Sequence, residues 1–116
     1  MRRALLPLLL FLGPVPLLAA AKTAHEQVAF GLTVAQKGLW QEARFRFERA
    51  VAIDPQNAAA LNDLAVSLEQ MGEFDKARQC YEKALKLKPG DLYIRQNFDL
   101  FREADDKRNR KSRRKK

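Results

Sequence analysis

The sequence contains few of the residues that build catalytic or metal-binding sites: it has one cysteine and one histidine in 116 residues. The single cysteine, Cys80, excludes an intrachain disulfide and a thiolate metal site made from this chain alone. We interpret it as a small apolar helix residue, with an intermolecular disulfide as the alternative. The one histidine, His25, has no serine placed to pair with it, and no glycine-rich phosphate loop occurs. The sequence therefore predicts a protein without enzymatic activity, cofactor or metal.

Basic residues exceed acidic ones, giving a net charge of +8, but the excess is confined to one end of the chain. Residues 22–106 carry 12 Lys/Arg and 14 Asp/Glu, whereas residues 107–116 carry 8 Lys/Arg and no acidic residue. A basic face on the folded domain, as in many nucleic-acid-binding folds, is therefore not indicated. An anionic partner should meet the C-terminal segment first.

The first 21 residues have the three-part organisation of a secretory signal peptide. Arg2 and Arg3 give a positive start, residues 4–12 are apolar, and small residues precede Lys22. The whole apolar stretch is short for a membrane span and is interrupted by proline and glycine. The sequence predicts a signal peptide over residues 1–21, cleaved after Ala21 or one residue earlier, and export to the periplasm or the exterior. The alternative is an uncleaved N-terminal segment that tethers the protein to a membrane.

Residues 24–57 align with residues 58–91 without a gap, at an offset of 34. Small residues fall opposite small ones and large apolar residues opposite large ones, as close helix packing requires. Identical pairs include Ala24/Ala58, Gly38/Gly72, Ala43/Ala77, Ala50/Ala84 and Pro55/Pro89, and similar pairs include Phe30/Leu64, Trp40/Phe74 and Phe47/Tyr81.

Each of these units is predicted to form two helices. In the second unit, Asn57 can cap a helix over residues 58–71, which ends at Gly72. The next helix begins at Phe74, carries apolar residues at helical spacing, and ends before Pro89.

The sequence resembles tetratricopeptide repeats in its 34-residue period and in residues at matching positions, which are Gly38, Gly72, Ala77, Tyr81, Ala84 and Pro89. The resemblance covers residues 24 to about 105. Gln27 and Leu61 stand where such repeats often carry a large aromatic residue, so the match is looser there.

Residues 92–106 begin like a third repeat, with Asp91 as the cap and Phe98 continuing an apolar column. Asp99 then replaces a small residue and no partner helix follows, so we interpret this segment as a closing helix. The expected domain over residues 22–106 is all-α: a right-handed helical-hairpin solenoid of about two and a half tetratricopeptide units with five helices. Because stacked repeats need about three units for stability, we expect help from self-association or a partner.

The resemblance implies a concave groove, formed by the first helices of successive units, on which a peptide or protein partner binds. The residues expected to face this groove are His25, Val28, Leu32, Gln36, Ala59, Asn62, Val66, Glu69, Gln70, Tyr93, Gln96 and Leu100. Some family members hold a chaperone's carboxylate tail with lysine, arginine and asparagine at set groove positions. Val28, Leu32 and Asp63 occupy such positions here, so that clamp is not expected. The alternative is that the apolar groove residues only pack against one another.

Residues 107–116 form a block of like charge without an apolar residue and are predicted to be disordered. Attraction to anionic lipid or surface polymer is favoured over solvation without a partner and over nucleic-acid binding, because an exported protein rarely meets DNA. The residues expected to contact such a surface are Lys107, Arg108, Arg110, Lys111, Arg113, Arg114, Lys115 and Lys116.

These features predict an exported, non-catalytic adaptor or scaffold that binds a protein partner on the groove and an anionic surface through the tail. One alternative is a homo-oligomeric structural subunit of an envelope assembly, in which Tyr93 and Leu100 are buried against another chain. A further alternative is an intracellular protein associated with nucleic acid, which requires that the leader stays unprocessed.

Overall fold

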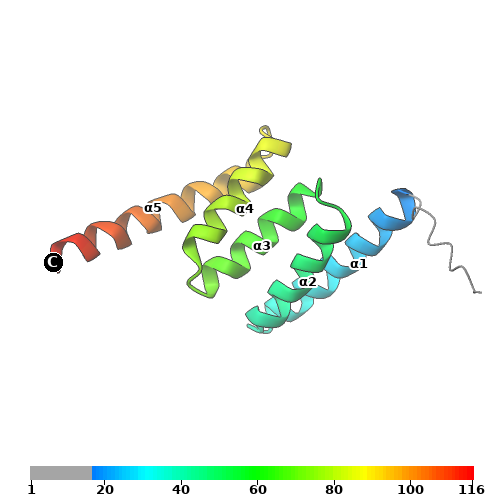
Figure 1. Cartoon of the computed structure of the whole chain (residues 1–116), viewed down its shortest axis with the longest axis horizontal. Coiled ribbons are helices and arrows are strands. Elements are labelled where there is room, and N and C mark those ends of the chain that lie inside the picture. Colours follow the sequence, from blue (N-terminus) through cyan, green and yellow to red (C-terminus); the bar gives the residue numbers. More distant parts are fainter. Residues whose placement is uncertain (1–16) are drawn as a thin grey trace, which may run out of the picture.

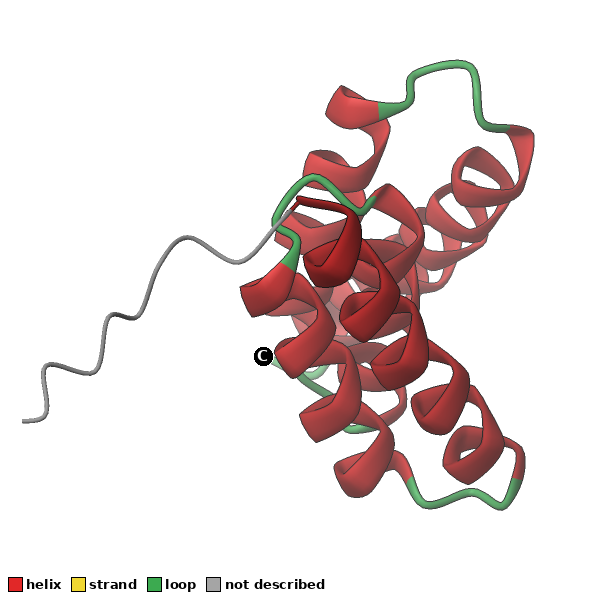
Figure 2. Ribbon diagram, turned by 90° about the vertical axis from the view of Figure 1, so that its right-hand side faces the viewer, coloured by secondary structure: helices red, strands yellow, loops and turns green. Residues whose placement is uncertain are grey.

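The computed structural model describes residues 17–116, and over that range the chain is built from helices joined by short loops (Figure 2). The helices are α1 (Leu17–Gln36), α2 (Trp40–Ile53), α3 (Ala58–Gln70), α4 (Phe74–Leu87) and α5 (Leu92–Arg114) (Figure 1). Helix α1 packs on α2 and α3 packs on α4, and the two pairs stack through α2 and α3. Helix α5 then packs on α4 and α3. The predicted all-α solenoid of two helical pairs and a closing helix is confirmed.

Glycine turns and polar caps set the helix ends at the predicted positions. Gly38 and Gly72 end the first helix of each pair with φ angles of +75° and +78°, which residues other than glycine rarely adopt. The Asn57 side chain accepts a hydrogen bond of 3.0 Å from the backbone amide of the third residue of α3. Asp91 accepts the equivalent bond of 3.1 Å at the start of α5. These caps satisfy backbone donors that a helix start leaves unpaired.

Small residues let the helices of each pair pack closely around one large ring. Ala43 and Ala77 are fully buried, and so are the rings of Phe47 and Tyr81. A Cβ atom at Gly31 would lie only 2.5 Å from the Phe47 ring. Any larger residue at this position would therefore overpack the first helix pair. The alternation of small and large residues in the repeat is thus what brings the helices together.

The first half of α5 is fixed to α4 by an aromatic ring and a charged cluster. The buried Phe101 ring lies 5.4 Å from the Tyr81 ring, measured between centroids. Asp105 accepts hydrogen bonds from Arg78 of α4 at 2.5 Å and from Arg108 at 3.0 Å. Desolvation tends to raise the pKa of Asp105, but these bonds hold it below its ordinary value. The carboxylate is therefore kept charged where the two helices meet.

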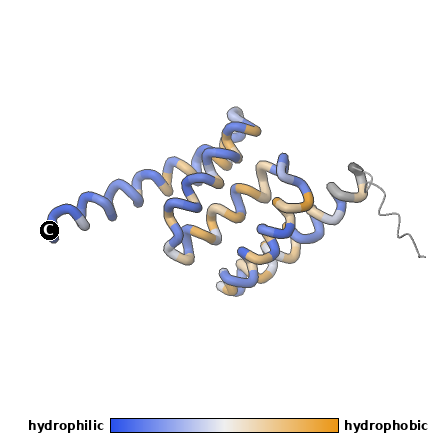
Figure 3. Tube along the Cα trace, viewed as in Figure 1, coloured by the Kyte–Doolittle hydropathy of each residue, from blue (hydrophilic) through white to orange (hydrophobic). Residues whose placement is uncertain are grey.

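The basic C-terminal segment differs from the predicted disordered tail, because α5 continues through it to Arg114. This hydrophilic half of α5 projects beyond the other helices (Figure 3). Lysine and arginine are good helix formers, and the packed first half of α5 supplies the nucleus from which the helix extends. Lys107 also pairs with Glu103 one turn earlier at 2.9 Å, and cations near a helix C-terminus interact favourably with its dipole. The structure therefore has no boundary at residue 106.

The predicted signal segment, residues 1–21, lies mostly outside the described residues, because the description begins at Leu17. Residues 17–21 form the start of α1, and Ala24 is the first buried residue among the side chains that the structure describes. The observed packing of the first repeat thus begins after the predicted cleavage point. No helix within residues 17–116 is long and apolar enough to span a bilayer.

Candidate functional site

A small pocket opens where residues of α1, α2, α3 and α5 meet, and we call it the groove pocket. Its lining residues are Leu32, Ala35, Gln36, Trp40, Phe47, Asp63, Val66 and Tyr93. Its volume is about 210 Å³, which is below the roughly 300–1,000 Å³ of ordinary small-molecule sites. The groove pocket is therefore suited to a single side chain of a partner rather than to a cofactor.

Four of the predicted groove residues meet in this pocket: Leu32, Gln36, Val66 and Tyr93. They come from the first helix of each successive unit, which is the arrangement that the repeat predicted. Leu32 and Tyr93 are exposed and Val66 is half-buried, so these side chains remain accessible to a partner.

Other predicted groove residues lie outside the groove pocket. Gln96 and Leu100 border a second hollow along the exposed side of α5. His25 and Gln70 are exposed, as is Ala59, and none of the three lines either hollow. Val28 is half-buried and packs against the core. The accessible part of the groove is therefore lined by fewer residues than the sequence predicted.

Two predicted groove residues have structural contacts instead. Asn62 is buried, and its Oδ1 accepts a hydrogen bond of 3.1 Å from Nδ2 of Asn97 on α5. Glu69 accepts a bond of 3.0 Å from the buried hydroxyl of Tyr81. Burial, with a further contribution from Glu69, raises the pKa of that hydroxyl. The prediction that Asn62 faces a partner is wrong, since α5 covers it, and helical spacing alone does not reveal which positions a later helix will cover.

One wall of the groove pocket carries a carboxylate, Asp63. Nδ2 of Asn62 donates to its Oδ1 at 3.3 Å, and this is the one hydrogen bond to the Asp63 carboxylate from within residues 17–116. Burial raises the pKa of Asp63 from 3.8 to about 6, although the bond from Asn62 acts in the opposite direction. At neutral pH the pocket therefore holds a poorly compensated negative charge.

Three lining residues were not assigned to the groove from the sequence: Ala35, Trp40 and Phe47. In the repeat alignment Trp40 matches Phe74, which predicts packing between helices rather than a place in a pocket. The structure places Trp40 at the first position of α2, directly after the turn at Gly38. That tight turn brings the indole beside the end of α1, where it joins the pocket wall.

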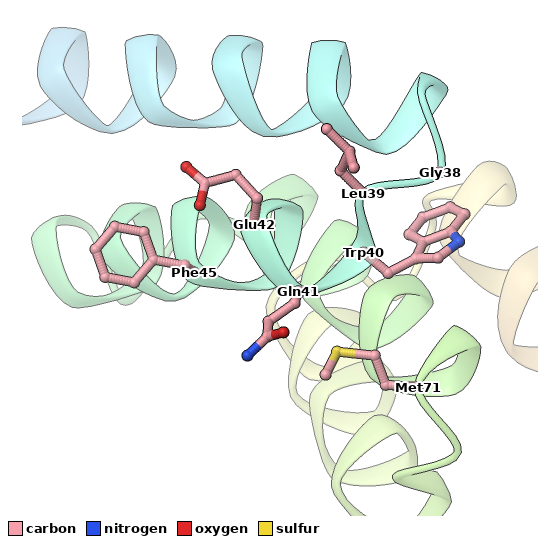
Figure 4. Close-up of a pocket in the computed structure, with 7 residues that line it drawn as sticks. All are labelled: Gly38, Leu39, Trp40, Gln41, Glu42, Phe45 and Met71. Carbon is pink, nitrogen blue, oxygen red and sulfur yellow. The ribbon is translucent and has the colours of Figure 1, made fainter.

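A wider hollow of about 720 Å³ borders the turn between α1 and α2. It is lined by Gly38, Leu39, Trp40, Gln41, Glu42, Phe45 and Met71 (Figure 4). Figure 4 shows that these side chains diverge, with Phe45 and Trp40 at opposite ends. Because polar groups do not converge on one point there, this hollow is not a candidate for specific recognition.

The basic residues of the C-terminal segment fall into two groups. Arg108 belongs to the folded body: its guanidinium lies 3.5 Å from the centroid of the Phe74 ring, and it pairs with Asp105. Lys107 pairs with Glu103. The other six of the eight are exposed and make no ion pair with residues 17–116; they are Arg110, Lys111, Arg113, Arg114, Lys115 and Lys116.

The described residues offer binding surfaces more readily than reactive groups. Within residues 17–116, no group of three or more His, Cys, Asp and Glu side chains is placed to hold a metal ion. Cys80 is a half-buried free thiol, and burial raises its pKa, which lowers the fraction of reactive thiolate. The groove pocket and the projecting basic helix are therefore the two candidate sites.

Residues 35–96 match the family model described as tetratricopeptide repeat. A probable UDP-N-acetylglucosamine–peptide N-acetylglucosaminyltransferase SPINDLY from Solanum lycopersicum is 30% identical over 69 residues. The matched segment is 60% of this chain but 7% of that protein. Because the chain spans so small a part of this relative, its activity is not carried over.

Several solved structures share the fold. The tetratricopeptide domain of Sgt2 from Aspergillus fumigatus has a TM-score of 0.70 at 17% identity, covering 75% of this chain and 59% of that one. MamA has a TM-score of 0.67 at 29% identity, covering 77% and 52%. The second such domain of human RPAP3, in complex with the HSP70 peptide SGPTIEEVD, has a TM-score of 0.65 at 18% identity, covering 69% and 67%. The chain thus spans between 52% and 67% of these three chains.

Proposed function

Because the chain belongs to the tetratricopeptide repeat family, we propose that it is a non-catalytic interaction module that binds a protein or peptide partner on its groove. The observation that carries the proposal is the convergence of Leu32, Val66 and Tyr93, from three successive first helices, on one accessible and largely apolar pocket. The RPAP3 domain, which shares the fold, is solved with a bound peptide, and this supports a peptide-binding use of the scaffold.

A second surface supports contact with an anionic membrane or polymer. Six exposed cations lie on the projecting end of α5 and on the two residues that follow it. Three of them, at positions 110, 111 and 114, gather with Lys107 along one side of the helix. Each cation held near an anionic bilayer contributes about 1 kcal/mol of attraction. The body of the protein is nearly neutral by sequence, so this attraction is concentrated at the end of the helix. Nucleic acid is also an anionic polymer, but it can bind the basic helix only if the two are in the same compartment.

The groove and the basic helix are expected to respond differently to substitution and salt. Val66→Asp places a charge in the apolar contact and should weaken partner capture at least about tenfold. It should leave binding to anionic vesicles unchanged. Replacing the six exposed cations with glutamine keeps a good helix former at each position and should remove vesicle binding while partner capture persists. Capture by affinity purification and vesicle sedimentation measure the two activities.

Salt gives the matching control. Raising it from about 0.1 M to about 1 M shortens the Debye length from about 10 Å to about 3 Å, which should release the vesicles but not the partner. Equal loss of partner capture in Val66→Asp and in the glutamine variant would show that groove and basic helix form one surface. Capture that survives Val66→Asp would remove the groove from the proposal.

We propose that the protein acts outside the cytoplasm after removal of the leader. The mature chain purified from its native cell should begin at Lys22 or Ala21, as intact mass spectrometry can measure. Cleavage there leaves Ala24, the first buried residue described, inside α1. A mature species that retains Arg2 and Arg3 would overturn export as a soluble protein and favour membrane tethering or an intracellular role.

A homo-oligomeric assembly is a second candidate, because α5 exposes apolar side chains. Leu92, Tyr93 and Leu100 are 79%, 64% and 60% exposed, and a short array would gain stability by covering them. Sedimentation at low micromolar concentration separates the two candidates, since an adaptor should be monomeric and a structural subunit associated.

A further inference from the structure

The groove pocket has the chemical features of a site for a cationic side chain. Leu32 and Val66 provide apolar wall, and Trp40 and Tyr93 provide aromatic rings. Asp63 provides the one charge among the lining residues. Lysine and arginine have an apolar stem that packs against aliphatic side chains and a charged end. That end is attracted both to aromatic faces and to a carboxylate.

We propose that the groove pocket takes a lysine or arginine side chain of the partner, with the stem against Leu32 and Val66 and the charged end at Asp63. This inference rests on the proposed groove function and adds the chemistry of the residue that is recognised. An acidic partner segment is disfavoured, because it would bring a second negative charge to a carboxylate that is poorly screened by solvent. The peptide in the RPAP3 complex, SGPTIEEVD, has three acidic residues, and this pocket is unsuited to such a ligand.

Hydrogen bonds between neighbouring side chains fix the position of Asp63, which indicates that the binding site is formed before a partner binds. Asn97 of α5 donates to Asn62 at 3.1 Å, and Asn62 in turn donates to Asp63 at 3.3 Å. This chain of bonds leaves Oδ2 of Asp63 without a donor from within residues 17–116. The Asp63 carboxylate is half-buried, so the fold disfavours its charged form, and a cation from a partner would offset that cost.

The charge and apolar character together identify a separate partner rather than the protein's own basic helix as the occupant. The segment over residues 107–116 has no apolar residue to cover Leu32 and Val66. Helix α5 also carries this segment away from the helical pairs (Figure 1). The expected occupant is therefore a peptide in which a lysine or arginine has apolar neighbours.

Trp40 is the one tryptophan of the chain and lines the groove pocket, so its fluorescence reports occupancy directly. The probes are three acetylated and amidated peptides that share the sequence Ala-Leu-Ala-X-Ala-Leu-Ala, in which X is lysine, norleucine or glutamate. Norleucine keeps the stem of lysine and lacks its charge. In about 0.15 M salt, the lysine peptide should change Trp40 emission with an affinity about tenfold above that of the norleucine peptide. The glutamate peptide should bind most weakly.

Asp63→Asn should abolish the advantage of lysine over norleucine. The control is Glu82→Gln, which alters net charge equally at an exposed position on α4 and should preserve the lysine preference. Equal binding of the three peptides, or a lysine preference that survives Asp63→Asn, would overturn the assignment of a cation site while leaving groove binding intact. If none of the peptides changes Trp40 emission at millimolar concentration, the pocket is not a peptide site, and the groove function itself fails at this position.

Discussion

Replacing Phe101 with alanine is expected to lower the free energy of unfolding by about 3–5 kcal/mol, the cost of removing a large buried ring and leaving a cavity. The Phe101 ring is fully buried and lies among Tyr81, Phe98 and the Arg78 guanidinium. It joins α5 to α4, so its loss should also weaken the attachment of the closing helix. Urea denaturation followed by circular dichroism measures the change.

Its neighbour on the same helix, Leu100, provides the matched control. Leu100 is 60% exposed, so Leu100→Ala should alter stability by no more than about 0.5 kcal/mol. If Phe101→Ala also alters stability by no more than about 0.5 kcal/mol, α5 is not docked on α4. If Leu100→Ala is as destabilising as Phe101→Ala, the exposed face of α5 is covered, as the homo-oligomeric alternative requires.

Replacing Asp63 with asparagine is expected to stabilise the protein at neutral pH by about 3 kcal/mol. The pKa of Asp63 is raised from 3.8 to about 6, so the folded chain disfavours the charged form that predominates at pH 7. Below about pH 3.5 the carboxyl is protonated in both folded and unfolded chains, and this penalty disappears. The penalty develops as pH rises from about 4 to about 6 and is constant above that range.

The pH dependence of the difference between the two proteins is the diagnostic quantity. The free energy of unfolding of Asp63→Asn minus that of the parent should grow by about 3 kcal/mol between about pH 3.5 and pH 7. In a domain of this size, each kcal/mol of added stability raises the melting temperature by roughly 4–8 °C. A difference that is flat with pH would show that Asp63 is solvated in the folded protein, and would weaken its role in the groove pocket.

The helical pairs and their turns could be predicted from the sequence because the same pattern of small and large residues occurs in both repeats. Ala43 and Ala77 occupy matching positions, and both are buried where helices approach closely. Gly38 and Gly72 match in the same way, and both adopt a positive φ. A pattern that recurs at a fixed offset reports contacts within each unit, so the local fold follows from it directly.

Contacts made between units and by the closing helix were less predictable. Asn62 lies at the helical spacing expected of a groove residue, but Asn97 of α5 covers it. No periodicity in the sequence encodes that contact. Trp40 reaches the groove pocket through the geometry of a turn rather than through helical spacing. The basic segment was expected to be disordered from its composition, yet it extends a helix that is already nucleated and fixed by Phe101 and Asp105. Composition predicts how a segment behaves in isolation, whereas here the preceding part of α5 nucleates the helix.

Site-specific photo-crosslinking can show directly whether the partner binds on the groove. A benzophenone amino acid placed at Leu32, an exposed residue of the groove pocket, is compared in the native cell with the same group at Glu82 on α4 and at Lys111 on the basic helix. We expect a discrete protein adduct from Leu32 that Asp63→Asn diminishes, and no such adduct from Glu82 or Lys111. The same adduct from Glu82, or an adduct from Lys111 alone, would contradict binding on the groove.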